Sequence, residues 1–190
     1  KLLSSESEKL NPGFSYRMRH GRPYIRSKVA MSLDGRTAMA SGESKWITGP
    51  EARQDVQNLR ARSSAIMTGI GTILADDPQL NVRFSADHDN WYPSGQKIRQ
   101  PLKIIVDSDG RLPASAQILK EGKVLVITAN DITIAEPAEC LVLPSVDQNI
   151  DLNALMAVLA QREINELMIE AGGVLNGALL KAGLIDELVI

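Results

Sequence analysis

A glycine-rich turn beside a glutamate is the part of this chain best suited to chemistry on a phosphorylated ligand. The run 169–177 reads IEAGGVLNG, which places Glu170 at the end of an apolar segment and the pair Gly172-Gly173 at the expected start of a helix. Free N–H groups and the dipole at a helix N-terminus favour a phosphate group, and glycine lets a ligand approach the backbone closely. On spacing alone, the run also fits a plain strand-to-helix turn.

A second turn, Gly69-Ile70-Gly71-Thr72, also follows an apolar segment. It lacks the third glycine of a G-x-G-x-x-G dinucleotide motif, because Leu74 stands there, and no Gly-Lys-Ser/Thr follows, which excludes a P-loop. We expect a tight turn into a short helix that ends at Asp76-Asp77-Pro78. Such a turn could offer N–H groups and the Thr72 hydroxyl to a cofactor.

Arg60 and Arg83 could hold a substrate phosphate, because guanidinium groups bind phosphate oxygens in a bidentate manner. The alternative for both is ordinary solvated surface charge. Lys28 lies among the apolar residues of an expected strand, so it is either on an exposed strand face or a buried polar group with a function. Trp46, an aromatic residue in an expected loop, could stack on a ring or pack at the domain edge.

Metal and nucleophilic chemistry find little support in the residue pattern. His20 and His88 lie far apart with no cysteine cluster near them, so we expect no metal site. The single cysteine, Cys140, excludes an internal disulfide and suits a reducing cytoplasm. Because it lies in an apolar segment with no histidine nearby in sequence, we expect it in the core.

The bulk composition limits the classes of protein that fit. A chain of 190 residues can form one domain with a substantial core. Its 21 basic and 23 acidic residues give a net charge of −2, which argues against a general nucleic-acid binder. No apolar run approaches the roughly 20 residues that span a bilayer, and the N-terminus has no signal-peptide pattern. We therefore expect a cytoplasmic protein without membrane contact.

Apolar segments that alternate with helical repeats predict the elements of an α/β domain. Strands are expected at 24–33, 65–68, 103–107, 124–128, 140–143, 167–170 and 187–190. One helix is expected after a capping box of Thr48 and Glu51, with Pro50 in its first turn. Others are expected after Asp151 and from Gly172 to about residue 182. The alternation predicts a mostly parallel sheet with helices on both faces, and 77–101 should form an exposed loop.

Six segments together resemble one family, the reductase domain of the bifunctional deaminase–reductase of riboflavin biosynthesis. They read KVAMSLDGRTA, GESKWIT, RARSSAIMTGIGTILADDPQLNVR, IVDS, EAGG and AGLIDEL, and the resemblance they carry spans nearly the whole chain from Pro23 onward. The resemblance implies a dihydrofolate-reductase-like α/β fold with a mostly parallel twisted sheet flanked by helices. It also implies NADPH as cofactor and reduction of the ribosyl side chain of 5-amino-6-(5-phosphoribosylamino)uracil to the ribityl form.

The matching motifs also imply roles for individual residues. Cofactor contacts are implied for Ala30, Trp46, Thr72, Asp76, Ser108, Gly172, Gly173, Val174, Leu175, Asn176, Gly177 and Ala178. Substrate contacts are implied for Ser44, Arg60, Leu80, Arg83 and Glu170. Lys28 and Glu170 are the candidate catalytic residues that place or donate a proton, and the sequence does not decide between them. The glycine turn thus resembles a cofactor-phosphate site, and the arginines resemble a substrate-phosphate site.

Two departures from the family pattern shape the expected domain organisation. Family members usually carry an N-terminal zinc deaminase domain with H-x-E and P-C-x-x-C motifs, which this chain lacks. Residues 1–22 are therefore expected to be an interdomain linker, or an interdomain helix, left from that absent domain, and residues 23–190 a reductase domain that is incomplete at its C-terminus. Zinc and the deamination of 2,5-diamino-6-(5-phosphoribosylamino)pyrimidin-4-one would belong to the parent protein.

The family also implies a small phosphorylated pyrimidine as substrate and a homodimer or higher homo-oligomer. Two other functions stay open from the residues alone. One is a dihydrofolate-reductase-type enzyme, which would share the fold. The other is a nucleotide-binding or dimerisation module without catalysis.

Overall fold

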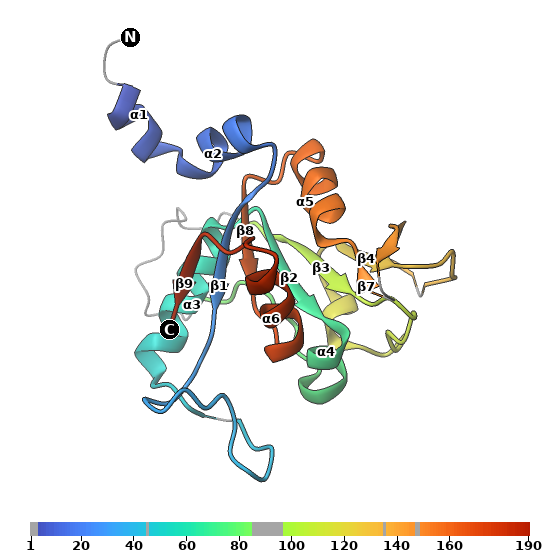
Figure 1. The fold of residues 1–190 in the computed structure, drawn as a ribbon. Coiled ribbons are helices and arrows are strands. Elements are labelled where there is room, and N and C mark those ends of the chain that lie inside the picture. The colour runs from blue at the N-terminus through green and yellow to red at the C-terminus, as the bar shows by residue number, and fades with distance from the viewer. Residues whose placement is uncertain (1–3, 45, 85–96, 135, 147–148) are drawn as a thin grey trace.

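The sheet consists of seven parallel strands in the order β5-β4-β3-β2-β8-β1-β9 (Figure 1). The computed structural model describes residues 4–44, 46–84, 97–134, 136–146 and 149–190. The strands are β1 (Tyr24–Lys28), β2 (Ala65–Gly69), β3 (Leu102–Val106), β4 (Val124–Thr128), β5 (Glu139–Val142), β8 (Glu166–Ile169) and β9 (Glu187–Val189). This arrangement confirms the predicted α/β fold.

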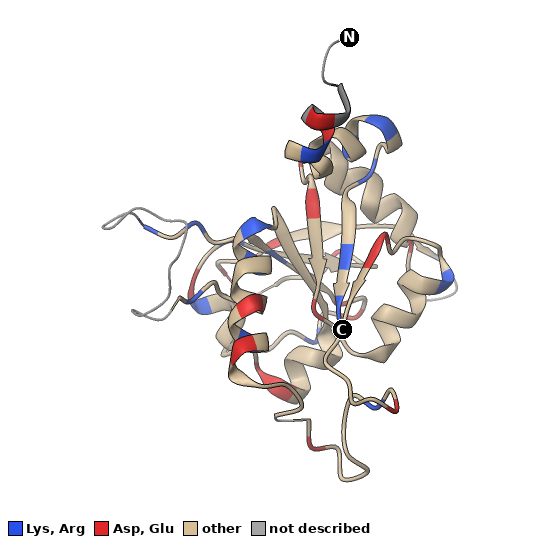
Figure 2. Cartoon of the chain, turned by 90° about the vertical axis from the view of Figure 1, so that its left-hand side faces the viewer, with Lys and Arg blue, Asp and Glu red and all other residues tan. Residues whose placement is uncertain are grey.

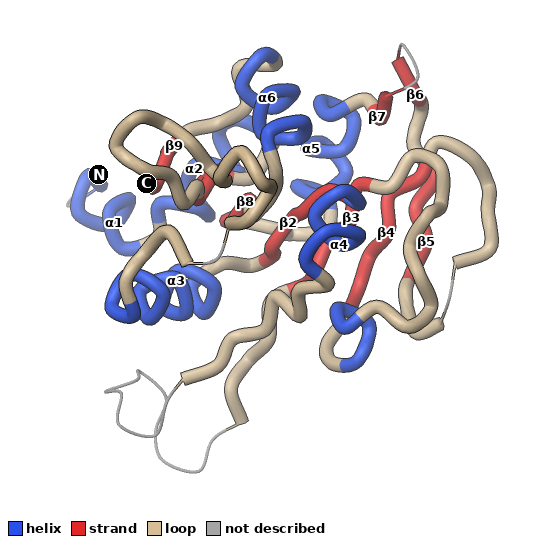
Figure 3. The backbone as a smooth tube through the Cα atoms, turned by 90° about the horizontal axis from the view of Figure 1, so that it is seen from below, coloured by secondary structure: helices blue, strands red, loops and turns tan. Residues whose placement is uncertain are grey.

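Helices cover both faces of this sheet. α5 (Leu152–Gln161) and α6 (Gly173–Lys181) lie on one face, and α3 (Pro50–Arg62) lies on the other, as the view along the sheet in Figure 3 shows. The short helix α4 (Ile70–Asp76) follows β2 directly, and the 3-10 helix η1 (Gln117–Lys120) precedes β4. Figure 2 shows basic and acidic residues interspersed over these elements, rather than a face of one sign.

The central strands β2, β4 and β8 are mostly apolar on both sides because a parallel sheet covered by helices is buried on both faces. Along β2, Ala65 and Met67 belong to the cluster shared with α5 and α6, while Ile66 between them belongs to the cluster on the α3 side. All three side chains are fully buried. This alternation, which follows from the pleat of a strand, divides the core into two layers and fixes which strand residues face α3.

Two helices precede the sheet, α1 (Ser4–Leu10) and α2 (Pro12–His20), in the segment where an interdomain linker or helix was expected. Asp186 fixes the end of this segment, since its carboxylate accepts hydrogen bonds from the Tyr16 hydroxyl (2.6 Å), the Arg22 guanidinium (2.7 and 2.8 Å) and the Ile25 N–H (2.8 Å). Although burial opposes ionisation, these donors hold the pKa of the Asp186 carboxyl below its ordinary value. Helix α2 is therefore anchored to the segment between α6 and β9.

Two local expectations about element boundaries need correction. The first strand ends at Lys28 instead of continuing to 33, because its neighbour β9 ends at Val189, the residue that pairs with Lys28. Helix α3 begins after Gly49, which carries no side-chain cap, so the Thr48 capping box is wrong. A proline at the first helical position holds the preceding residue in extended conformation and makes that residue the N-cap.

Other local predictions stand or change in smaller ways. Asp151 caps α5 as predicted, since its Oδ1 accepts the N–H groups of Asn153 (2.9 Å) and Ala154 (3.1 Å). The hairpin of β6 (Ser145–Val146) and β7 (Asn149–Ile150) was not predicted, because strands of two residues show no periodicity. Cys140 is partly exposed on edge strand β5 and not in the core. The loop expected to be exposed at 77–101 is wrong for Leu80, Asn81 and Val82, which are buried under side chains of distant segments, and its residues 85–96 lie outside the described part.

A lysine sits in the core between β3 and η1. Lys103 has no exposed surface, and its ammonium donates to the carbonyl oxygens of Ile118 (3.0 Å) and Glu121. Burial lowers the pKa of Lys103 from 10.5 to about 8, against the opposing effect of the Glu121 carboxylate. A charged lysine at this position costs stability at neutral pH.

This lysine predicts a stability that rises in alkaline solution. The unfolded chain keeps the Lys103 proton up to about pH 10.5, and the folded chain releases it at about pH 8. Between these values the unfolded state binds more protons, so the free energy of unfolding increases with pH, by at most about 3 kcal/mol. Urea titrations across this window should show a gain for the wild type relative to Lys103→Met. A difference that stays constant with pH would contradict the prediction.

Candidate functional site

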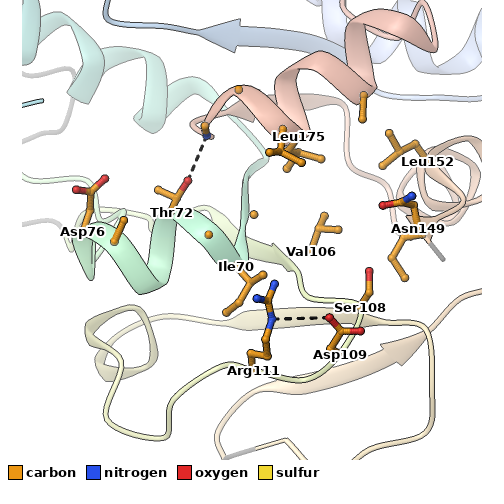
Figure 4. Close-up of a pocket in the computed structure, with 18 residues that line it drawn as sticks. Ile70, Thr72, Asp76, Val106, Ser108, Asp109, Arg111, Asn149, Leu152 and Leu175 are labelled. Carbon is orange, nitrogen blue, oxygen red and sulfur yellow. Dashed lines mark hydrogen bonds and ion pairs between the residues drawn. The ribbon is translucent and has the colours of Figure 1, made fainter. Parts of the chain in front are cut away.

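A cavity of about 580 Å³ lies where β2 and β3 end and α6 begins (Figure 4). Its wall is formed by the turn from β2 into α4, the segment after β3, the start of α5 and the first turns of α6. Carboxyl ends of parallel strands are where α/β proteins bind their ligands. The volume falls within the range of roughly 300–1,000 Å³ that is usual for cofactor and small-molecule sites.

One side of the cavity is the N-terminus of α6. Its N-cap, Gly172, has ordinary extended backbone angles (φ −72°, ψ 178°), and no side chain of the described residues caps the helix. The Gly172 N–H donates to the Thr72 hydroxyl (3.2 Å), which ties α4 to α6 across the cavity wall (Figure 4). Uncapped N–H groups at the positive end of the helix dipole favour an anionic group in the cavity.

The opposite side is the segment that follows β3. Ser108, Asp109 and Arg111 line it, and Arg111 pairs with Asp109 at 3.8 Å (Figure 4). Asp107 supports this segment from below, since it is fully buried and its Oδ2 accepts the Leu112 N–H at 2.9 Å. Arg111 is the one basic side chain among the described residues that line the cavity.

The cavity brings together most of the residues expected to contact a cofactor. Eight line it: Thr72, Asp76, Ser108, Gly172, Gly173, Val174, Leu175 and Ala178. Four are not among its described lining residues: Ala30, Trp46, Asn176 and Gly177. Sequence reasoning missed Ala75, Val106, Asp109, Arg111, Asn149, Ile150 and Leu152. For Asp109 and Arg111 the signal was available, because they directly follow Ser108 at the end of a predicted strand.

Two of the four residues outside the lining, Asn176 and Trp46, make contacts elsewhere. Asn176 accepts a hydrogen bond from the Ser27 hydroxyl (2.7 Å) and donates to the Ala171 carbonyl (2.6 Å), so its side chain fastens α6 to the sheet. Trp46 is 74% exposed, and the Arg53 guanidinium lies 4.5 Å from the centre of its ring. A cation over an exposed indole leaves the other ring face open to a ligand.

Arg60 and Glu170 form a buried pair beside the cavity. The guanidinium donates from Nε to Oε1 (2.6 Å) and from Nη2 to Oε2 (2.8 Å), and the side chains are 10% and 12% exposed. Its Nη1 donates to the carbonyl of Asn81 at 2.9 Å. The interpretation of Arg60 as a solvated surface charge is therefore wrong. Three donor positions of its guanidinium are used within the protein, two of them to orient a carboxylate.

Glu170 and Gly172 connect this pair to the cavity. Both belong to the turn from β8 into α6, with the Glu170 side chain held by α3 and the Gly172 backbone lining the cavity. Strands β1 and β8 pair in parallel, with Ser27 opposite Ile169. Lys28 and Glu170 are the next residues of these strands, so the alternation of side chains places both on the face covered by α3.

The remaining expected substrate residues lie on loops. Leu80 is 4% exposed and adopts a left-handed backbone conformation (φ +51°). Arg83 is exposed, and its N–H donates to the Gln57 side chain (2.9 Å) while its Nη1 donates to Gln79 (3.1 Å). Ser44 is partly exposed in the loop before α3. Of the two arginines, Arg83 is thus the one whose guanidinium faces solvent.

Within the described residues, no set of three or more histidine, cysteine, aspartate or glutamate side chains is arranged to hold a metal ion. In the same part of the chain, no helix has both the length and the apolar character needed to cross a membrane.

A parallel sheet with a cavity at its strand ends, beside an uncapped helix N-terminus, is the arrangement in which α/β domains bind anionic cofactors and nucleotides. The chain belongs to the family described as RibD C-terminal domain, whose model matches residues 23–190. The fold is of the dihydrofolate-reductase-like type shared by the reductase domains of this family.

Named relatives and a solved structure agree with this assignment. Riboflavin biosynthesis protein RibD of Escherichia coli (strain K12) is 47% identical over 195 residues, which span 100% of this chain and 53% of the relative. A 5-amino-6-(5-phosphoribosylamino)uracil reductase of Buchnera aphidicola is 42% identical, over 80% of this chain and 76% of the relative. The structure of Acinetobacter baumannii RibD matches with a TM-score of 0.82 and 46% identity, over 97% of this chain and 49% of the other. The chain spans about half the length of the curated RibD relatives it matches.

Proposed function

We propose that the protein reduces the ribosyl side chain of 5-amino-6-(5-phosphoribosylamino)uracil to the ribityl form, with NADPH as the reductant. The observation that carries the proposal is the turn from β8 into α6. It presents the buried Glu170–Arg60 pair on one side and the cavity-lining Gly172 on the other. A hydride donor and its acceptor must meet within a few ångströms. A turn that borders both the cofactor cavity and the proposed substrate site would bring the nicotinamide and the pyrimidine substrate within this distance.

The cavity residues fit a dinucleotide cofactor. The uncapped N–H groups of the first turn of α6, which begins at Gly173, suit its pyrophosphate. A Cβ atom at Gly172 would lie 3.9 Å from the Thr72 hydroxyl, so the backbone there is open on its cavity side. Ser108 and Arg111 offer a hydroxyl and a cation on the opposite wall, which supports NADPH over NADH because a 2′-phosphate needs such partners.

The bound cofactor would supply the hydride, and the residues of this chain would orient the acceptor and manage its charge. Arg60 would fix both oxygens of Glu170, so that the carboxylate presents one geometry to the substrate. Lys28, at the end of the neighbouring strand, is the second candidate for placing or donating a proton. Arg83 would bind the substrate phosphate, because its guanidinium remains accessible to solvent.

The Arg83→Ala variant should raise KM for the phosphorylated pyrimidine and leave the affinity for NADPH nearly unchanged. A charge-assisted hydrogen bond to phosphate contributes roughly 1.5–3 kcal/mol, which corresponds to about ten- to more than a hundredfold in affinity. Steady-state kinetics with the phosphorylated and the dephosphorylated substrate measure this. The loss should be smaller for the dephosphorylated compound. Equal losses with both would show that Arg83 holds its loop instead of the phosphate.

Cofactor choice tests the proposed reductant. Calorimetric titration of the protein should show tighter binding of NADPH than of NADH, and catalytic efficiency should follow the same order. Equal affinity and equal efficiency with both would contradict the assignment of NADPH. An Arg111→Ala variant should reduce the preference, whereas Arg36→Ala on an exposed loop should not.

The remaining features of the whole protein are part of the same proposal. Zinc-dependent deamination would belong to a further domain, as the RibD relatives of about twice this length suggest. A homodimer and a cytoplasmic location stay predictions. The family assignment favours the pyrimidine over dihydrofolate, although both enzymes share the fold.

A further inference from the structure

The segment Leu80–Arg83 is irregular and yet largely buried. Leu80, Asn81 and Val82 are each less than 5% exposed, although the segment belongs to no helix or strand. A buried loop must find partners for its backbone groups outside regular structure. Here the partners are side chains from elements that are distant in the sequence.

The backbone groups of Val82 and Arg83 are hydrogen-bonded to side chains of two different segments. The Val82 N–H and carbonyl both bond to the Gln100 amide (2.8 and 3.1 Å). The Arg83 N–H bonds to Gln57 of α3 at 2.9 Å. These contacts hold the residues that follow Leu80, whose backbone is left-handed (φ +51°), a conformation uncommon for leucine.

Asn81 is the centre of this arrangement. Its carbonyl accepts Nη1 of Arg60 (2.9 Å), and its Nδ2 donates to Oε2 of Glu121 (2.7 Å). Its Oδ1 is buried without a hydrogen-bond partner in the described part of the chain. The orientation of the amide follows from Glu121, because a carboxylate accepts from the NH₂ group and repels the oxygen. The Asn81 amide keeps this orientation although its buried Oδ1 has no hydrogen-bond partner in the described part of the chain, which costs stability. This indicates that the position of Asn81 is needed for the arrangement of the segment.

Glu121 is itself anchored. Its carbonyl accepts the ammonium of Lys103, which is fully buried in β3 and also bonds to Ile118. The following residue, Gly122, has φ +79° and its Cβ position faces Lys103 Cε at 3.6 Å, so the turn is closed against the lysine. The β3 lysine therefore fixes the point from which Glu121 reaches Asn81.

We infer that Asn81 and Glu121 are positioning residues for the substrate site. Neither belongs to the described residues that line the cavity, and the hydrogen bonds described for the Glu170 carboxylate come from Arg60. They act through Arg60, because the Asn81 carbonyl sets the third contact of the guanidinium whose other two contacts hold Glu170. They also fix the segment that carries Leu80 and Arg83. The role of Asn81 and Glu121 in substrate binding rests on the proposed function. Their role in holding the segment Leu80–Arg83 in place rests on the contacts alone.

The test compares Glu121→Ala with Glu121→Gln, which keeps an oxygen that can accept from Asn81. We expect Glu121→Ala to raise KM for the pyrimidine by about tenfold and to leave the NADPH dissociation constant unchanged. The Gln variant should restore most of the loss. Lys120→Ala, an exposed neighbour in η1, is the matched control and should behave as the wild type. A KM unchanged in Glu121→Ala would overturn the inference.

A second readout does not depend on activity. Hydrogen exchange of the Val82 and Arg83 amides should accelerate in Glu121→Ala and return towards the wild-type rate in Glu121→Gln. Exchange that is unaffected in the alanine variant would overturn the inference, whatever the kinetics show. Faster exchange in a protein that never reduces the pyrimidine would sustain the inference on the segment and refute the proposed function.

Discussion

The Arg60→Ala variant is expected to lose about 3–5 kcal/mol of unfolding free energy, because breaking a buried pair leaves an uncompensated charge. The charge left behind is the Glu170 carboxylate, which is 12% exposed in the folded protein. The carbonyl of Asn81 would lose the same partner. Turnover should fall at least about tenfold, since the carboxylate would no longer be held in one geometry.

Urea unfolding and steady-state kinetics measure the two effects. Arg36→Ala is a suitable control, because Arg36 pairs with Asp34 on the surface, where the side chains are 71% and 64% exposed. A surface pair contributes about 0–1 kcal/mol. Arg60→Lys keeps the charge without the bidentate contact, and it should recover part of the stability and little of the turnover. Similar losses of stability from Arg60→Ala and Arg36→Ala would refute the structural role given to the buried pair.

The Gly172→Val variant should weaken NADPH binding at least about tenfold, equivalent to 1.4 kcal/mol or more, while the fold stays stable. The backbone at Gly172 is extended (φ −72°), which valine adopts without strain, and the nearest atom to its Cβ position is 3.9 Å away. The added methyl groups would stand in the cavity, where the pyrophosphate is proposed to approach the helix N-terminus.

Fluorescence titration with NADPH and thermal unfolding separate these outcomes. Ala182→Val places the same side chain at the exposed other end of α6 and should change neither quantity by much. A Gly172→Val protein that binds NADPH normally would remove the α6 terminus from the cofactor site. A variant that also melts early would show that Gly172 serves packing.

The elements that are predictable from the sequence are those whose signals are local. Strand 124–128 was predicted with the bounds that β4 has, because five consecutive apolar or β-branched residues between turn residues admit little else. Asp151 could be recognised as a cap from its position before an apolar helical repeat. The glycine turn into α6 was also found, since glycines after a buried strand mark such a turn.

The site residues that escaped prediction depend on contacts between distant segments. The helical spacing of α3 places Arg60 at the edge of an apolar stripe, and its burial results from Glu170, which is 110 residues away. The sequence does not indicate that Asn81 and Lys103 belong to one hydrogen-bond network. Their partners lie in α3 and in the turn after η1, far from both residues in the sequence. Trp46 was identified on a motif, and the structure leaves it exposed and outside the described lining of the cavity.

The most direct test of the central claim is the loss of the reduced-nicotinamide absorbance when the protein is mixed with NADPH and 5-amino-6-(5-phosphoribosylamino)uracil. We predict oxidation that depends on the pyrimidine, with the ribityl compound as product, and no comparable rate with dihydrofolate in its place. NADPH binding without oxidation in the presence of the pyrimidine would contradict the proposed reductase. Faster oxidation with dihydrofolate would assign the same fold and cavity to a different substrate.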